Sequence, residues 1–202
     1  MAGQLFVISG PSGVGKSSII RRLQDSLPHV GYSVSHTTRT PRKDEIAGIA
    51  YHFVDRMTFG KMIRENRLVE WAEVYGDLYG TSFASLNSQL DDDLDVLLDV
   101  DSVGAVNIRK HYKESVLVYI CPPSLEVLEE RLRNRATEDE QAFRDRFDMA
   151  RKELSHCASY DYLVLNDDLE KAVEELAGIV LAQRCLTRRR LPEIRAALDF
   201  PY

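Results

Sequence analysis

The sequence predicts an α/β fold with three layers, in which a mostly parallel sheet lies between two layers of helices. Three observations support this prediction. Short, continuously apolar runs such as Leu5–Ile8 are typical of parallel strands that are covered on both faces. Stretches with helical spacing of apolar residues follow these runs. A glycine-rich loop joins the first run to the first helix. With 202 residues, the chain has the size of one domain with small insertions.

The glycine-rich loop is the most specific local motif in the chain. It matches the pattern G-x-x-x-x-G-K-[ST] with Gly10, Pro11, Ser12, Gly13, Val14, Gly15, Lys16, Ser17 and Ser18. The glycines allow backbone N–H groups to approach a polyphosphate closely. Lys16 would then face the β- and γ-phosphates of a nucleoside triphosphate, and the Ser17 hydroxyl would complete a Mg²⁺ shell. The alternative is an ordinary glycine-rich turn, which the buried strand before the loop and the helical stripe from Ile19 to Leu27 after it disfavour.

Composition and charge exclude several classes of protein. Hydrophobic residues make up 44% of the chain, and no apolar run approaches the length of a membrane span. The net charge of -6 argues against an extended nucleic-acid groove. The start of the chain lacks the pattern of a signal peptide, and Cys121, Cys157 and Cys185 form no C-x-x-C motif. The histidines also lack metal-ligand spacing. We therefore expect a cytoplasmic protein with reduced thiols and neither nucleic acid nor membrane as a partner.

Residues 35–81 are predicted to form a small mixed lobe inserted into the parallel sheet. Its predicted elements are strands at Tyr32–His36, Tyr51–Val54, Leu68–Tyr75 and Leu78–Thr81, and a short helix capped by Asp55. The stretch 35–43 mixes hydroxyls with Arg39, Arg42 and Lys43, which suits a phosphomonoester, although charge runs are more often solvated loops. Glu70 lies between Val69 and Trp71, where a buried carboxylate needs a partner; an exposed strand face is the alternative.

After this lobe the chain returns to the core. Ser82 is predicted to cap a helix through Leu86 and Leu90, and the acidic stretch 91–95 is predicted to be a solvated turn. The strand Val96–Asp101 ends in Asp99 and Asp101, whose i, i+2 spacing places both at the carboxyl end, where open α/β sheets bind ligands. Asp99 resembles the acidic residue that enzymes with this loop place near Mg²⁺. The alternative is that the pair caps the next helix.

A helical lid is predicted at about 135–157. Before it, Val116–Ile120 is a strand and Ser124 caps a helix with Leu125, Leu128 and Leu132 inward. A capping box at 137–140 starts the lid helix, which would pack through Phe143, Phe147, Ala150 and Leu154. Arginines gather here, at Arg131, Arg133, Arg135, Arg144, Arg146 and Arg151. They indicate a segment that closes on an anion, although surface salt bridges would explain some of them equally well.

The last core elements are a strand at Tyr160–Asn166 and a long amphipathic helix from Leu169 to Val180. The tail with Arg188–Arg190 fits either a fraying end or an oligomer contact, and the sequence leaves the oligomeric state open.

The residues favour an ATP-dependent kinase of a phosphomonoester. Phosphoryl transfer needs positioning and neutralisation of charge more than a covalent nucleophile, and the chain supplies a donor loop, an acidic residue and arginines. It shows no obvious catalytic histidine. An acceptor that is already an ionised phosphate requires no base, because no proton must be removed.

Taken together, the motifs resemble those of the guanylate kinase family. The matching segments are Gly10–Ser18, Ser35–Arg42, Tyr79–Ser82, Asp99–Asp101 and Tyr160–Asp168, and they cover nearly the whole chain in the family's order. The resemblance implies a three-layer P-loop kinase that transfers the γ-phosphate of ATP to GMP with Mg²⁺, in purine nucleotide metabolism. It also implies a single domain with a core at about 1–34, 82–134 and 158–190, a GMP-binding lobe at about 35–81 and the lid.

The resemblance also implies residue roles. Catalytic roles are implied for Lys16, Arg135, Arg146 and Asp99, and ATP binding for the phosphate loop and Asn166. Guanine contacts are implied for Ser35, Glu70, Thr81 and Asp101, and a clamp on the GMP phosphate for Arg39, Arg42, Tyr51 and Tyr79. Ser17 and Asp99 are the implied metal-side residues. Two positions depart from the family pattern: Val103 replaces a usual glutamine, and Ala136 replaces a usual glycine in the lid.

The chemistry of guanine agrees with this assignment. Carboxylates at Glu70 and Asp101 can accept from N1–H and the N2 amino group, while hydroxyls can donate to O6. Adenine has the opposite pattern at N1 and N6, so AMP would leave these groups unpaired, which is worth about 10⁴-fold in discrimination. Two alternatives are a ribose phosphate kinase of related fold and a non-catalytic guanylate-kinase-like interaction domain. The first does not require Glu70 together with Asp101, and the second typically lacks the intact phosphate loop.

Overall fold

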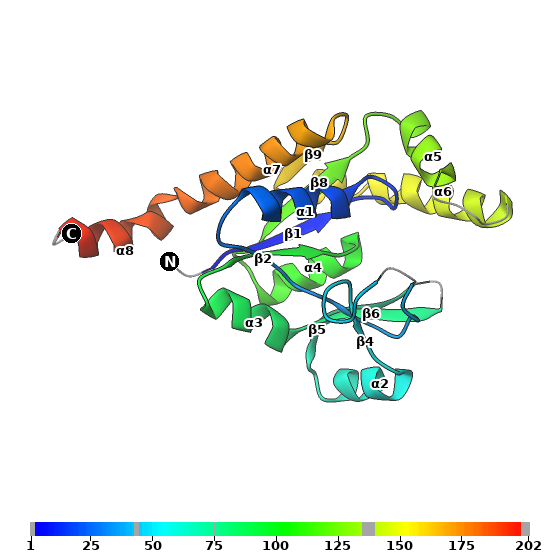
Figure 1. The fold of residues 1–202 in the computed structure, drawn as a ribbon, viewed down its shortest axis with the longest axis horizontal. Coiled ribbons are helices and arrows are strands. Elements are labelled where there is room, and N and C mark those ends of the chain that lie inside the picture. The colour runs from blue at the N-terminus through cyan, green and yellow to red at the C-terminus, as the bar shows by residue number, and fades with distance from the viewer. Residues whose placement is uncertain (1–2, 43–44, 75, 135–139, 199–202) are drawn as a thin grey trace.

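The computed structural model describes residues 3–42, 45–74, 76–134 and 140–198 (Figure 1). Its central sheet has five strands in the order β2-β7-β1-β8-β9, and all of its pairings are parallel. The strands are β1 (Leu5–Ser9), β2 (Val30–Tyr32), β7 (Asp95–Asp99), β8 (Val116–Cys121) and β9 (Tyr162–Leu165). The predicted parallel sheet is confirmed.

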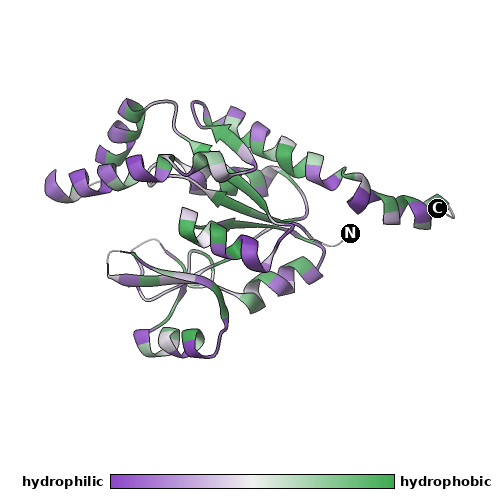
Figure 2. Ribbon diagram, turned by 180° about the vertical axis from the view of Figure 1, so that it is seen from behind, coloured by the Kyte–Doolittle hydropathy of each residue, from purple (hydrophilic) through white to green (hydrophobic). Residues whose placement is uncertain are grey.

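Helices cover both faces of this sheet, as the continuous apolar runs predict. Phe6 and Ile8 point to the face that carries α1 (Lys16–Ser26) and α7 (Leu169–Arg184). Leu5 and Val7 pack on the other side with residues of α3 (Phe83–Asp91) and α4 (Ser102–His111). Figure 2 shows the apolar strands between helices whose outer faces are largely hydrophilic. Because every residue of β1 is buried, the strand cannot show the alternating pattern of a half-exposed sheet.

Side-chain caps begin several helices where the sequence predicts them. The Ser82 hydroxyl accepts from the Ser85 N–H at 3.2 Å at the start of α3, and the Ser124 hydroxyl accepts from the Val127 N–H at 3.3 Å. The Ser124 cap begins α5 (Leu125–Arg133). Asp55 caps α2 (Arg56–Arg64) in the same way. These bonds satisfy backbone donors that have no partner within the first helical turn.

The inserted lobe is a mixed sheet in the order β4-β3-β6-β5, with α2 at its outer end (Figure 1). Its strands are β3 (His36–Thr37), β4 (His52–Phe53), β5 (Leu68–Val74) and β6 (Asp77–Ser82). The predicted single strand from Tyr32 to His36 is wrong. The chain leaves the central sheet after Tyr32, where the Ser33 N–H still donates to the Leu97 carbonyl, and pairs with the small sheet from His36. Local alternation does not reveal which sheet supplies the partner.

The lid side is built by α5 and α6 (Glu140–Leu154), which share an apolar contact through Leu128, Leu132, Phe143 and Ala150. Leu125 was expected to point inward but is 37% exposed, because it occupies the first turn of α5, ahead of that contact. Of the predicted capping box at 137–140, residues 137–139 lie outside the described residues, and Glu140 is the first residue of α6. Within the described ranges, no helix is long and apolar enough to cross a membrane.

Asp95 corrects the prediction of a solvated acidic turn. It belongs to β7, is 4% exposed, and accepts from the Gln4 N–H at 2.9 Å. Its carboxylate also pairs with Arg184 at 2.7 Å and with Arg189 at 3.3 Å. Arg189 belongs to α8 (Thr187–Leu198), so this pair holds the start of the C-terminal helix against the core. At this residue the tail is therefore neither a fraying end nor free for an oligomer contact.

Replacing Asp95 with alanine is expected to lower the free energy of unfolding by about 3–5 kcal/mol, because two largely buried guanidinium groups lose their anion. Urea denaturation measures this change directly. The matched control is Asp92→Ala, which removes an exposed carboxylate from the same acidic stretch and is expected to change stability by less than about 0.5 kcal/mol. Equal midpoints for both variants would contradict the assigned role of Asp95.

Candidate active site

The phosphate loop adopts backbone conformations that favour glycine. Gly10, Gly13 and Gly15 have φ angles of 146°, 85° and 103°, a region that side chains rarely adopt. A Cβ atom on Gly15 would lie 2.4 Å from Nδ2 of Asn166, so a side chain there would displace this amide and strain the backbone as well. That amide donates to the Val14 carbonyl at 2.6 Å. Asn166, expected to bind ATP, thus supports the loop from behind.

Arg131 is a second support for the loop, which the sequence did not single out. Its guanidinium donates to the Val14 carbonyl at 3.3 Å and to the Asn166 carbonyl at 3.1 Å. The residue belongs to α5, so one side chain ties the loop, the end of β9 and the lid side together. Only its place among other arginines was visible in the sequence.

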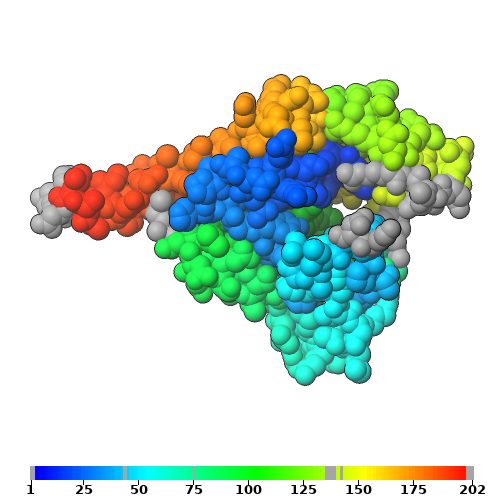
Figure 3. Space-filling view, in the orientation of Figure 1, coloured from blue at the N-terminus to red at the C-terminus, as the bar shows by residue number. Residues whose placement is uncertain are grey.

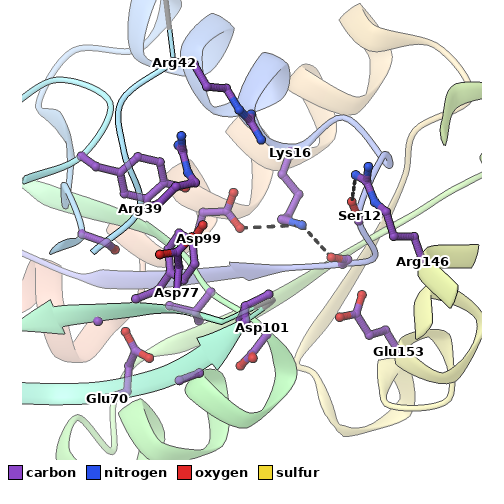
Figure 4. A pocket seen from close by; sticks show the side chains of 18 of the residues that line it. Ser12, Lys16, Arg39, Arg42, Glu70, Asp77, Asp99, Asp101, Arg146 and Glu153 are labelled. Carbon is purple, nitrogen blue, oxygen red and sulfur yellow. Dashed lines mark hydrogen bonds and ion pairs between the residues drawn. The ribbon is translucent and has the colours of Figure 1, made fainter. Parts of the chain in front are cut away.

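Lys16 begins α1 and turns back over the loop. Its ammonium donates to the Gly10 carbonyl at 2.6 Å and lies 3.7 Å from the Asp99 carboxylate (Figure 4). Asp99 ends β7 and pairs in register with Ile8 of β1, directly before the loop. Burial raises the pKa of the Asp99 carboxyl, and the Lys16 ammonium opposes that shift. The loop after β1 and the end of β7 thus bring a cationic and an anionic side chain together. The sequence predicted Asp99 at this strand end, but not its ion pair with Lys16.

A cavity of about 710 Å³ extends from this loop to the inserted lobe (Figures 3 and 4). Most predicted site residues line it, namely Gly10, Ser12, Lys16, Ser35, Arg39, Arg42, Tyr51, Glu70, Tyr79, Asp99, Asp101 and Arg146. Among the other predicted residues, Thr81 is fully buried behind the wall and Ser17 is exposed at the start of α1. Arg135 and Ala136 lie outside the described residues. The cavity also includes Tyr32, Asp77, Asp145 and Glu153, which the sequence did not indicate.

Glu70 is the most buried acid at the lobe end of the cavity. It is 8% exposed, which excludes the alternative of an exposed strand face. The Thr81 hydroxyl donates to its carboxylate at 2.7 Å, and the Ser35 hydroxyl lies 3.3 Å from that of Thr81. Burial raises the pKa of Glu70 to about 7, with a further contribution from the charge of Asp101, while the bond from Thr81 opposes the shift. Since Thr81 donates its proton to Glu70, the Ser35 hydroxyl is the donor to the Thr81 oxygen. Of these two hydroxyl residues, Ser35 lines the cavity and Thr81 does not.

Asp101 has two roles. Its carboxylate accepts from the Gly104 N–H at 2.7 Å and so caps α4, as the simpler alternative for this residue proposed. It also lines the cavity beside Glu70. A Cβ atom at Gly104 would lie 3.2 Å from the Glu70 carboxylate and 3.3 Å from that of Asp101, so this glycine leaves room for both acids. Val103, the departure from the family pattern, is 65% exposed and does not line the cavity.

Basic and aromatic side chains form the side wall of the cavity. The Arg39 guanidinium lies 5.5 Å from the centre of the Tyr51 ring, and that ring packs edge-on against Tyr79 at 5.8 Å. Arg39 pairs with Glu45 at 2.8 Å, and only 15% of its side chain is exposed. Arg39 itself is therefore held in a cluster of side chains, whereas Thr40, Pro41 and Arg42 are exposed, as in the alternative of a solvated loop.

The lid helix α6 faces the loop from the opposite side. Arg146 donates to the Ser12 hydroxyl at 3.4 Å (Figure 4). Glu153, two turns later on the same face, also lines the cavity, and burial raises its pKa while the Lys16 ammonium lowers it. The salt-bridge alternative holds for other arginines here, because Arg133 pairs with Glu129 and Arg144 pairs with Glu140. The lid side thus directs Arg146 alone of these three into the cavity.

Comparisons with known proteins find relatives along nearly the whole chain. A family model described as guanylate kinase matches residues 2–183. A guanylate kinase of Alcanivorax borkumensis is 45% identical over 197 residues, which cover 98% of this chain and 95% of that protein. One of Carboxydothermus hydrogenoformans is 45% identical over 93% of this chain and 92% of its own length. The crystal structure of guanylate kinase from Anaplasma phagocytophilum superimposes with a TM-score of 0.79 at 32% identity, covering 96% of this chain and 94% of that one.

Proposed function

Since this chain belongs to the guanylate kinase family, we propose that its cavity transfers the γ-phosphate of ATP to GMP, with ATP on the phosphate loop and GMP against the inserted lobe. The observation that carries this proposal is that Lys16 at one end and Glu70 at the other line the same cavity. The reaction needs both ends, because an in-line transfer requires donor and acceptor phosphates to meet. Family membership favours this reaction over the alternatives of a ribose phosphate kinase and a non-catalytic interaction domain.

On the donor side, the loop and Lys16 hold the phosphates of ATP. The positive φ angles of its glycines turn the backbone of the loop into a cradle, and α1 directs its positive end toward the bound anion. The Lys16 ammonium, already placed by the Gly10 carbonyl, neutralises charge that develops between the β- and γ-phosphates. Arg146 approaches from the lid and adds a second positive charge. We propose that Arg135 also helps to neutralise the transferred phosphoryl group, because the resemblance to the family implies this role.

On the acceptor side, the base lies against Glu70 and Asp101. Their carboxylates accept from N1–H and the N2 amino group of guanine, and the Ser35 hydroxyl donates to O6. Thr81 acts through Glu70, because its hydroxyl donates to that carboxylate. The phosphate of GMP lies among Arg39, Arg42, Tyr51 and Tyr79, and its ionised oxygen attacks without a general base.

The residues present fit a magnesium ion held together with ATP. Within the described part of the chain, no cluster of three or more His, Cys, Asp or Glu side chains could enclose a metal by itself. Asp99 and the exposed Ser17 hydroxyl offer oxygen atoms at the loop, which suits Mg²⁺ because this ion keeps waters and phosphate oxygens in its shell. When bound, the ion would neutralise charge on the β- and γ-phosphates.

Calorimetric titration tests the division into two subsites. GMP and a non-hydrolysable ATP analogue are each expected to bind one equivalent, and each is expected to bind in the presence of the other. Competition between them would contradict the proposed placement, because it would put both nucleotides in one subsite.

Binding of GMP is expected to strengthen as pH rises toward 7 and to level off above it. The carboxyl of Glu70 has a raised pKa of about 7 in the free chain. Its ionised form accepts guanine donors more strongly than the protonated form, which also carries an O–H donor of its own. Below pH 7 binding must displace this proton, which costs about tenfold in affinity for each pH unit. The phosphate of GMP also titrates in this range, so the informative quantity is the difference between wild type and Glu70→Gln. Parallel pH profiles for the two proteins would contradict the role of this proton.

A further inference from the structure

Glu45 was not among the residues that the sequence analysis assigned to the site, yet its carboxylate joins the two arginines of the phosphate clamp. One oxygen of its carboxylate accepts from the Arg39 guanidinium at 2.8 Å, and the other accepts from the Arg42 backbone N–H at 2.8 Å. The Glu45 N–H donates back to the Arg42 carbonyl at 3.1 Å. Both oxygens are thus used, and each holds a different arginine.

Arg39 is fixed on several sides. Its second guanidinium nitrogen donates to the Thr40 carbonyl at 2.8 Å, and its plane lies over the rings of Tyr51 and Phe53. Only 15% of the Arg39 side chain and 19% of the Glu45 side chain are exposed. The bond to Arg39 lowers the pKa of Glu45, so the carboxylate stays ionised at neutral pH and the pair persists.

Arg42 is held differently. Its backbone is tied to Glu45, but among the described residues no ion pair or hydrogen bond engages its guanidinium. Figure 4 shows this guanidinium directed toward Lys16, on the side of the cavity from which the transferred phosphate would come. Glu45 therefore fixes the backbone of Arg42, while the Arg42 guanidinium stays available for a phosphate.

We propose that Glu45 is a positioning residue for the phosphate of GMP. By holding the Arg39 side chain and the Arg42 backbone at once, it sets the two guanidinium groups in place before the substrate arrives, so binding need not order them. This inference rests on the proposed function of the cavity. A simple charge argument predicts the opposite effect: if Glu45 only neutralised Arg39 and competed with phosphate, its removal would strengthen binding.

The test compares GMP with guanosine, which lacks the phosphate. In Glu45→Gln we expect the Kd of GMP to rise about tenfold while the Kd of guanosine stays within about twofold of wild type. The KM of GMP should rise similarly, whereas kcat and the KM of ATP should change by less than about threefold. Glu45→Asp keeps the charge but is one methylene too short to reach both arginines, so it should lie between wild type and Glu45→Gln.

The matched control is Glu73→Gln, which removes an exposed carboxylate that lies 3.6 Å from Arg56 in the same lobe. It is expected to leave both affinities unchanged. Unchanged or tighter GMP binding in Glu45→Gln would overturn the proposal, and so would an equal loss of guanosine affinity, which would mean that the lobe itself is disturbed. If wild type bound no GMP, the proposed function would fail instead, so the two failures are distinguishable.

Discussion

Replacing Lys16 with methionine is expected to reduce kcat by about 10³-fold while GMP binding stays close to that of wild type. The ammonium of Lys16 lies at the donor end of the cavity, 2.6 Å from the Gly10 carbonyl and 3.7 Å from Asp99. Methionine has a similar length and no charge, so it removes stabilisation of the developing phosphate charge without opening a cavity. The acceptor subsite is formed by other residues and should remain intact.

Two measurements separate these effects. Single-turnover rates with saturating ATP report the transfer step, and calorimetry reports the Kd of GMP. Lys152→Met, on an exposed face of α6, is the matched control and should retain full activity. A Lys16→Met variant with turnover near that of wild type would remove this residue from its proposed role.

Replacing Glu70 with glutamine and Asp101 with asparagine together is expected to lower kcat/KM for GMP by about 10⁴-fold, and each single change by about 10²-fold. Each amide puts a donor where guanine also presents a donor, so a buried N–H group loses its partner. Asparagine remains a good helix cap, so Asp101→Asn should still begin α4 and leave the fold stable. Glutamine at position 70 can still accept the bond from Thr81.

The decisive comparison for these variants is with AMP. The same changes should leave kcat/KM for AMP unchanged or raise it, because adenine offers an acceptor at N1 and a donor at N6. The ratio of GMP to AMP activity should therefore collapse. An equal loss for both nucleotides would indicate that the acids support the lobe and do not read the base.

The sequence predicted those parts of the fold whose signal is local. The apolar runs of β1, β7 and β8, the phosphate loop and the caps at Ser82 and Ser124 need only their neighbours along the chain to be recognised. The same holds for Asp99, because the end of a buried strand in a parallel sheet is a defined place. These are the features that the structure confirms.

The remaining features depend on partners far away in the sequence. In the sequence, Asp95 belongs to an acidic stretch that is typical of a turn. Its burial is explained by partners about ninety residues away in both directions, namely the Gln4 N–H, Arg184 and Arg189. In the same way, the structural role of Arg131 follows only from its hydrogen bonds to the Val14 and Asn166 carbonyls. The prediction of one strand at Tyr32–His36 was wrong, because the alternation of apolar and polar residues cannot show where a chain passes from one sheet to another.

In the candidate site, residue types that carry obvious chemistry were predicted, and those that support them were not. Glu45 looks like one more charge in a basic loop, Gly104 looks like a neutral helix residue, and Glu153 looks like one acid among many on an amphipathic helix. Their importance follows from contacts with Arg39, with the carboxylate of Glu70, and with the cavity beside Lys16. No spacing rule within a single helix or loop encodes such contacts.

The most direct test of the account is the release of ADP from ATP with a panel of acceptors: GMP, dGMP, AMP, CMP, UMP and ribose phosphates. The cavity predicts that GMP is preferred over AMP by about 10⁴-fold in kcat/KM, since only guanine pairs with both acids. The pyrimidine nucleotides and ribose phosphates should be poorer still. AMP or a ribose phosphate turned over as well as GMP would contradict recognition of guanine by Glu70 and Asp101.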